Sequence, residues 1–228
     1  MSSRRPLKRV LIKVSGEVLI DEETAHSVVR QLITAHHRDI RLAIVTGGGN
    51  FVRGRDCPLS NRVATDHAGM LATVINGIRF SDMLAPAVPV LHLCAFPIPG
   101  IVAGYDVHNA LMALEQKKIL ILSGGTGSPF FSTDSAAALR AAELRLDVIL
   151  KGTSVRGVFS ADPKKSRKPR FIPCLTYDYA LKNRIGVMDS TAFALCMEHR
   201  IPIVIFDIRK PSAIVDLIAG KRIGSIVC

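Results

Sequence analysis

The sequence predicts an α/β fold: a three-layer αβα sandwich around a mainly parallel central sheet. Short aliphatic runs alternate with longer segments of helical spacing, which is the order expected when helices cover both faces of a parallel sheet. The chain has no Trp and only 5% aromatic residues, so its core must be aliphatic, as in sheets that are buried on both faces. Its 228 residues, 48% of them hydrophobic, suffice for one domain with a large core.

Short aliphatic runs predict the buried strands. In chain order these runs are Val10–Val14, Leu42–Val45, Val88–Leu93, Ile119–Leu122, Val148–Leu150 and Ile203–Phe206.

Helices are predicted between most of these runs. Thr24–His37, Ala136–Arg140 and Thr191–Glu198 read as helices, the last with Asp189 or Ser190 as its N-cap. A longer helix is expected around residues 64–85, where Leu71, Val74, Ile75 and Ile78 follow the i, i+3, i+4, i+7 spacing of one apolar face. Gly157 and several prolines interrupt this pattern between residues 153 and 173, which predicts a hairpin followed by an exposed loop.

Composition limits the classes of function. The formal charge of +11 favours anionic partners, and the densest basic cluster, residues 164–170, fits either a solvated loop or a nucleic-acid contact. The five cysteines are scattered without a C-x-x-C pair, which argues against a zinc site or a disulfide framework. No stretch approaches a membrane span of about 20 apolar residues, and the N-terminus lacks a signal-peptide core, so we expect a cytoplasmic protein.

The predicted strand ends carry the candidate site, because open α/β sheets bind ligands beyond the carboxyl ends of their strands. Glycines, hydroxyls and cations follow four strands, at Lys13–Glu17, at Thr46–Asn50 with Arg53, at Ser123–Ser135 and at Lys151–Thr153. The third segment reads strand, glycine-rich loop, helix, an arrangement that offers backbone N–H groups and a positive dipole end to an anion. Together the four segments predict a polyphosphate site.

Two lysines within aliphatic runs are the sharpest detail. Burying Lys13 or Lys151 costs free energy unless the ammonium group is paired or reaches solvent at the sheet edge. The functional interpretation is a pair of cations directed at a transferring phosphoryl group, whose transfer depends mainly on positioning and charge stabilisation. Asp134 could hold both lysines, cap the following helix, or do both.

Other common sites are absent from the sequence. There is no G-x-x-x-x-G-K-[ST] loop, no G-x-G-x-x-G followed by an acidic residue at the dinucleotide spacing, and no G-x-S-x-G elbow. The seven histidines form no metal-like cluster.

A series of segments identifies a family. Asp66–Thr73 reads DHAGMLAT and Thr126–Asp134 reads TGSPFFSTD; around them stand Lys13–Glu17, Gly47–Asn50 with Arg53-Gly54, Leu150–Thr153, Gly157–Pro163 and Val187–Asp189. In this order, across nearly the whole chain from Val10, the segments resemble the amino acid kinase superfamily and, within it, the bacterial uridylate (UMP) kinases.

The resemblance implies the carbamate kinase-like fold and ATP-dependent phosphorylation of UMP to UDP in pyrimidine nucleotide biosynthesis. It implies Mg²⁺ bound mainly through the ATP phosphates, with no metal ligand supplied by the protein. It also implies a single domain over residues 1–228, with UMP bound by roughly residues 1–145 and ATP by roughly residues 146–228.

The resemblance assigns roles residue by residue. The catalytic group would be Lys13, Lys151 and Asp134. The ATP-binding residues would be Lys13, Ser15, Gly16, Gly49, Arg53, Thr153, Phe159 and Asp162. The UMP-binding residues would be Gly48, Asp66, Thr126, Gly127, Ser128, Pro129, Phe130, Phe131, Ser132 and Thr133, with Asp66 on the ribose hydroxyls. The UMP phosphate is already an anionic nucleophile, so no general base is needed.

Assembly and regulation follow from the same resemblance. Family members are typically homohexamers built from dimers, and the helix around residues 64–85 would be either a dimer contact or core. GTP and UTP are family effectors, but Ser81 stands where many relatives have an arginine, which argues against activation by GTP. The segment between Gly16 and Gly47 is shorter than usual for the family.

Two alternative functions remain open at this point. The charge and the basic cluster would suit a nucleotide-sensing or nucleic-acid-binding protein, alone or in addition to catalysis. A sibling kinase for an acylated amino acid is disfavoured by Phe130-Phe131 and Asp66.

Overall fold

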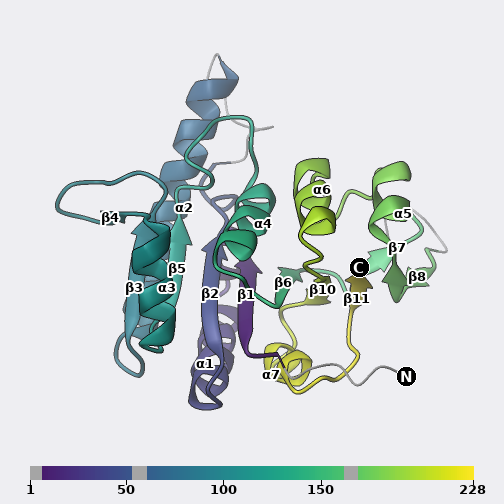
Figure 1. Ribbon diagram of the computed structural model, residues 1–228, viewed down its shortest axis with the longest axis horizontal. Coiled ribbons are helices and arrows are strands. Elements are labelled where there is room, and N and C mark those ends of the chain that lie inside the picture. Colours follow the sequence, from purple (N-terminus) through teal and green to yellow (C-terminus); the bar gives the residue numbers. More distant parts are fainter. Residues whose placement is uncertain (1–6, 53–60, 162–168) are drawn as a thin grey trace.

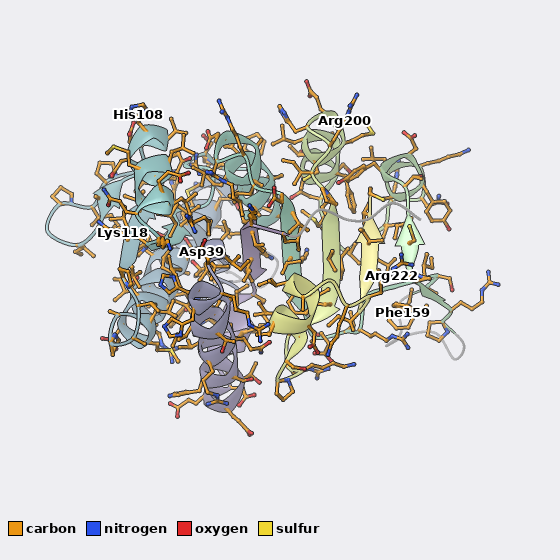
Figure 2. The ribbon with its side chains drawn as sticks, turned by 60° about the horizontal axis from the view of Figure 1, so that its bottom comes forward. Asp39, His108, Lys118, Phe159, Arg200 and Arg222 are labelled. Carbon is orange, nitrogen blue, oxygen red and sulfur yellow. The ribbon has the colours of Figure 1, made fainter. Side chains whose placement is uncertain are left out.

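The computed structural model describes residues 7–52, 61–161 and 169–228. Its architecture is a three-layer αβα sandwich with a mainly parallel sheet between two layers of helices, as predicted (Figure 1). The two helical layers are seen on opposite sides of the sheet in Figure 2.

One sheet of nine strands runs through the molecule in the order β4-β3-β5-β2-β1-β6-β10-β11-β9. All of its pairings are parallel except that between β10 and β11. The strands are β1 (Arg9–Val14), β2 (Arg41–Thr46), β3 (Val90–Cys94), β4 (Ala103–Gly104), β5 (Ile119–Ser123), β6 (Val148–Thr153), β9 (Cys174–Leu175), β10 (Ile203–Asp207) and β11 (Ser225–Val227). A separate hairpin pairs β7 (Val158–Phe159) with β8 (Phe171–Ile172).

Alternate residues of the central strands enter two aliphatic cores. Leu11 faces one core and Ile12 the other, as period-two alternation requires. The first core is covered by α3 (Val107–Glu115), α4 (Thr133–Glu143), α5 (Tyr177–Lys182) and α6 (Ser190–Glu198). The second is covered by η1 (Gly16–Leu19), α1 (Glu22–His37), α2 (Arg62–Leu84) and α7 (Ala213–Ile218).

Each predicted strand is present, with small shifts of its ends. The β3 strand begins at Val90 because Pro89 has no N–H group to donate, whereas β6 continues through Lys151 to Thr153. Of the two N-cap candidates for α6, the structure uses Asp189, whose Oδ1 accepts a hydrogen bond of 2.8 Å from Ala192 N.

The prediction for residues 153–173 was wrong in its order. The strands β7 and β8 flank the segment that carries the basic cluster, so the connection lies inside the hairpin rather than after it. In this hairpin Val158 pairs with Ile172 and Phe159 with Phe171. These partners are so far apart in the sequence that the hairpin cannot be recognised from it. Most of the 164–170 cluster lies outside the described residues.

The apolar stripe of α2 is not core. Val74 is buried, but Leu71, Ile75 and Ile78 are between 44% and 50% exposed. Among the described residues, no helix combines the length and the apolar character that a bilayer crossing requires.

Candidate active site

Strand register brings the two predicted lysines together. The parallel pairing of β1 with β6 places Lys13 directly beside Lys151, at the carboxyl ends of neighbouring strands. Both side chains point to the face of the sheet covered by α4 and α6, because Leu11 and Ile149, two residues earlier, belong to that core. The pairing of β1 with β6 is therefore what places the two lysines next to each other.

Asp134 joins both lysines from the first turn of α4. Lys13 Nζ lies 2.9 Å from Asp134 Oδ1, and Lys151 Nζ lies 2.5 Å from Asp134 Oδ2. Lys151 Nζ also donates to the carbonyl oxygen of Val187. The N-cap of α4 is Ser132, whose Oγ accepts from Asp134 N at 2.9 Å, so the capping role considered for Asp134 was wrong and its carboxylate serves the lysines.

The charges in this cluster do not balance, since two ammonium groups share one carboxylate. Burial alone would raise the pKa of Asp134, but Lys13 and Lys151 together outweigh burial and hold it below its usual value. Burial lowers the pKa of Lys151 from 10.5 to about 8; Asp134 opposes this shift, and the positive charge of Lys13 adds to it. Asp189 is a second, more distant carboxylate, and its charge also raises the pKa of Lys151. An anionic ligand beside the lysines would stabilise their ammonium forms further.

The lowered pKa of Lys151 predicts the pH dependence of the enzyme. The kcat/KM should fall as pH rises above about 8, because Lys151 loses its proton in the free protein. The fall in kcat should come at higher pH, since bound phosphates stabilise the ammonium form. Steady-state rates between pH 6 and 10 would check this; identical profiles for kcat and kcat/KM would contradict it.

Asp189 links the N-termini of α4 and α6 beside the lysines. Its carboxylate accepts hydrogen bonds from Ser132 Oγ and, at 2.9 Å, from Ser135 Oγ, in addition to capping α6. The carbonyl of Val187, two residues earlier, holds Lys151. The sequence analysis gave Asp189 only a capping role, and no local pattern signals that the Val187 carbonyl reaches a strand far away in sequence.

Two glycine loops border the lysine pair. Gly47 N donates to Val14 O at 2.8 Å, which fastens the loop after β2 to the end of β1. A Cβ atom placed on Gly48 would lie 2.7 Å from Gly69 O, so packing against α2 requires glycine there. A Cβ on Gly49 would meet no atom of the described residues within 4 Å.

The loop after β5 is held by backbone contacts and by Asp66. Gly124 has φ +76° and is packed against Cys94, which only glycine allows without strain. Asp66 Oδ2 accepts a hydrogen bond of 2.7 Å from Phe130 N, and Arg62 Nε lies 2.8 Å from the same carboxylate. Phe130 has φ +71° and is 66% exposed, so the loop holds this ring in a strained conformation outside the core.

The predicted loop residues therefore meet at one edge. Phe131 is 47% exposed beside Phe130, and Thr126 Oγ1 accepts from Ser128 N at 3.2 Å within the loop. Of the predicted UMP-binding residues, Asp66 is joined to the loop after β5 through Phe130, and Gly48 packs against α2, the helix that carries Asp66. The others lie in that loop and at the start of α4; they are Thr126, Gly127, Ser128, Pro129, Phe130, Phe131, Ser132 and Thr133.

Of the predicted ATP-binding residues, Ser15 caps η1 by accepting from Glu17 N at 3.4 Å, and Gly16 lies against Gly47 O. Thr153 Oγ1 lies 3.1 Å from Phe206 O, at the ends of β6 and β10. Arg53 and Asp162 lie outside the described residues.

A pocket of about 590 Å³ adjoins this side of the site, on the α7 face of the sheet. Phe206 and Phe171 form part of its apolar wall, and four cations, Arg156, Lys210, Lys221 and Arg222, line it. The Phe159 ring packs edge-on against Phe171 at 5.7 Å, which places this predicted ATP contact next to the pocket wall. Figure 2 shows Phe159 and Arg222 toward the same end of the sheet.

The known proteins that this chain resembles are kinases. Residues 8–207 match the model of the amino acid kinase family. The chain is 39% identical to the uridylate kinase of Pseudomonas putida, covering 100% of this chain and 96% of that protein. It is also 39% identical to the chloroplastic uridylate kinase PUMPKIN of Arabidopsis thaliana, covering 99% of this chain and 70% of the relative.

Solved structures give the same result. The UMP kinase of Bacillus anthracis superposes with a TM-score of 0.93 at 29% identity, covering 98% of this chain and 96% of that one. The UMP kinase of Ureaplasma parvum gives a TM-score of 0.89 at 35% identity, covering 97% and 98%. With this sheet, this lysine–aspartate cluster and these relatives, the chain belongs to the amino acid kinase family, among its uridylate kinases.

Proposed function

We propose that this protein transfers the γ-phosphoryl group of ATP to UMP, forming UDP and ADP. The observation that carries the proposal is the buried cluster of Lys13, Lys151 and Asp134 between two glycine loops at one sheet edge. The names of its relatives, uridylate kinases and UMP kinases, support UMP as the acceptor.

Each part of the cluster has a role in this reaction. The UMP phosphate attacks the γ-phosphorus in line, a bond to the β–γ bridging oxygen breaks, and negative charge spreads over the transferring oxygens. Lys13 and Lys151 stabilise that charge, while Asp134 keeps both ammonium groups in place. Because the attacking phosphate is already anionic, no residue has to remove a proton.

Mg²⁺ fits the proposal as a partner of ATP. Both oxygens of Asp134 are engaged by lysines, and Asp189 accepts bonds from Ser135 Oγ and Ala192 N, so neither carboxylate is available as an open metal ligand. Within residues 7–52, 61–161 and 169–228, no group of three His, Cys, Asp or Glu residues could hold a metal. The ion would therefore be held through phosphate oxygens, whose charge it would offset.

A direct assay tests the function. ADP release should be measured with UMP, CMP, dTMP and acetylglutamate as acceptors in the presence of Mg²⁺ and ATP. We expect turnover with UMP, and no turnover with UMP would overturn the proposal.

Asp66 is proposed to bind the ribose hydroxyls of UMP. Its carboxylate faces the loop after β5, where Phe130 N holds one oxygen. Asp66→Ala should raise the UMP KM by roughly tenfold to a hundredfold, the cost of a charge-assisted hydrogen bond, with a much smaller change in kcat. Steady-state kinetics at varied UMP would check this, and equal changes in kcat and KM would contradict the assigned role.

The pocket on the α7 face is proposed to receive the nucleoside of ATP. Its apolar wall suits a purine base, and its cations suit phosphates. The phosphate chain would pass over the carboxyl ends of the strands to reach Lys151, whose side chain lies on the other face of the sheet. Thr153 and Phe159 border this side, and Asp162 is proposed to join them. This arrangement agrees with a division of the domain into a UMP part and an ATP part near residue 145.

The outer face of α2 is proposed to form the dimer contact of a homohexamer. Leu71, Ile75 and Ile78 form an exposed apolar stripe on one side of a long helix, and such a patch favours association. Ile75→Lys should convert the wild-type hexamer into smaller species on analytical ultracentrifugation, because a charge would be buried at the contact. Met197→Lys, on the exposed side of α6, is the matched control; an unchanged hexamer in both variants would contradict the proposal.

Regulation and location complete the proposal. Ser81 Oγ donates to Gly77 O within α2, in place of the arginine that many relatives carry, so we propose that GTP does not activate the enzyme; UTP remains a candidate inhibitor. Among the described residues, Cys94, Cys174 and Cys196 are thiols, which supports a reducing compartment, and we propose that it is the cytoplasm. Nucleic-acid binding rests on a basic cluster mostly outside the described residues and stays a prediction.

A further inference from the structure

Asn76 is a fully buried carboxamide in the middle of α2, on the side opposite the exposed apolar stripe. Its Nδ2 donates to Gly47 O at 2.6 Å and to Asn50 Oδ1 at 2.7 Å. Its Oδ1 accepts from Asn50 Nδ2 at 3.1 Å, so the two amides bind each other reciprocally. A buried amide is tolerated only when it is hydrogen-bonded, and these bonds all go to the loop after β2.

That loop carries Gly48 and Gly49 between its two anchored ends, Gly47 and Asn50. Holding both ends fixes the two glycines with respect to α2 and to the end of β1. The loop after β1 meets the same point, because a Cβ on Gly16 would clash with Asn50 Oδ1 and lie 2.8 Å from Asn76 Nδ2. The carboxamide of Asn76 is thus where the phosphate-side loops of β1 and β2 meet.

Thr73, one turn earlier on α2, makes a parallel contact with the loop after β5. Its Oγ accepts from Gly124 N at 2.7 Å, and its carbonyl accepts from Thr46 Oγ1 at 3.0 Å. The inner side of α2 therefore anchors two loops. Thr73 holds the loop after β5, and Asn76 holds the loop after β2, which adjoins the lysines.

We infer that Asn76 is a positioning residue for phosphoryl transfer, whose carboxamide holds Gly48 and Gly49 in place between donor and acceptor. The inference rests on the proposed function, since it assigns the loop to the two nucleotides. Asn76 does not need to touch a substrate for this role, because it acts through the backbone of the loop.

The test is a double-mutant cycle on Asn50 and Asn76. Asn76→Ala should lower kcat on the order of tenfold to a hundredfold, because a misplaced positioning element costs about that much in rate. Asn50→Ala should lower kcat less, since Asn76 still holds Gly47 O. The double variant should be within about twofold of Asn76→Ala, because both residues act as one unit.

Leu84→Val is the matched control for a purely structural effect. Leu84 is fully buried at the other end of the same helix and belongs to the α1-side core. It should lower Tm while leaving kcat near the wild-type value at a temperature well below the transition. If Asn76→Ala lowers Tm as much as Leu84→Val and likewise leaves kcat unchanged, or if the two asparagine effects multiply, the inference is overturned.

The outcomes separate this inference from the proposed function. A wild-type protein that does not phosphorylate UMP contradicts the proposed function, whereas an active wild type with an equally active Asn76→Ala variant contradicts only the role of Asn76. Should Asn76→Ala fail to fold, Asn50→Ala decides, because Asn50 is only half-buried in the loop. An unchanged kcat in that variant overturns the inference.

Discussion

Lys151→Met should abolish most of the activity while leaving the fold intact. Methionine keeps an unbranched apolar stem but removes the charge that stabilises the transferring phosphoryl group. Loss of such a preorganised charge lowers kcat by about 10³-fold. Stability should not fall, because Asp134 keeps its ion pair with Lys13. The variant also removes the cost of burying the Lys151 ammonium group, the cost that lowers its pKa to about 8.

The measurement pairs kinetics with thermal unfolding. Lys118→Met is a matched control, since Lys118 directly precedes β5 at the opposite edge of the sheet (Figure 2). We expect the control to keep its kcat and Lys151→Met to keep its Tm. A kcat for Lys151→Met within tenfold of wild type would show that the charge is not used in the reaction.

Asp134→Ala should damage both activity and stability. It leaves two neighbouring ammonium groups, each at most 12% exposed, without the carboxylate that pairs with them. Removing one partner of a buried ion pair costs about 3–5 kcal/mol. For a chain of this size the Tm should fall by roughly 10 °C. The kcat should fall as well, because the lysines lose the group that orients them.

A second variant separates the two effects. Asp134→Asn combined with Lys151→Met removes one charge of each sign, so it should recover much of the lost stability while remaining inactive. Calorimetry and the ADP-release assay would measure these outcomes. If the double variant unfolds as readily as Asp134→Ala, unbalanced charge is not the cause of the instability.

The lysines that we propose as catalytic attract attention in the sequence because they violate the pattern around them. Lys13 and Lys151 are charged residues in aliphatic strands, and such positions demand an ionic partner. The lysine–aspartate contact itself follows from strand order and register, which only the folded sheet shows. Asp189 was predicted as a helix cap, and capping alone does not indicate that the same carboxylate binds Ser135 on α4.

Other features could not be predicted from local patterns. Leu71, Ile75 and Ile78 have the spacing of a core-facing stripe, but spacing alone cannot distinguish a core from a contact with another subunit. Asn76 belongs to none of the recognised motifs, and its proposed role depends on its hydrogen bond to the carbonyl of Gly47, which only the folded structure shows. The connection inside the β7–β8 hairpin was misplaced because its strands are only two residues long.

The register of β1 against β6 makes the site sensitive to changes in strand length. Deleting a single residue between Val148 and Leu150 would shift the following segment by one position and turn Lys151 toward the α1-side core. A buried loop can absorb such a change by rebuilding its backbone, but a central strand that is paired on both sides cannot. We therefore expect β6 to tolerate substitutions better than insertions or deletions, because its length determines on which face of the sheet Lys151 lies.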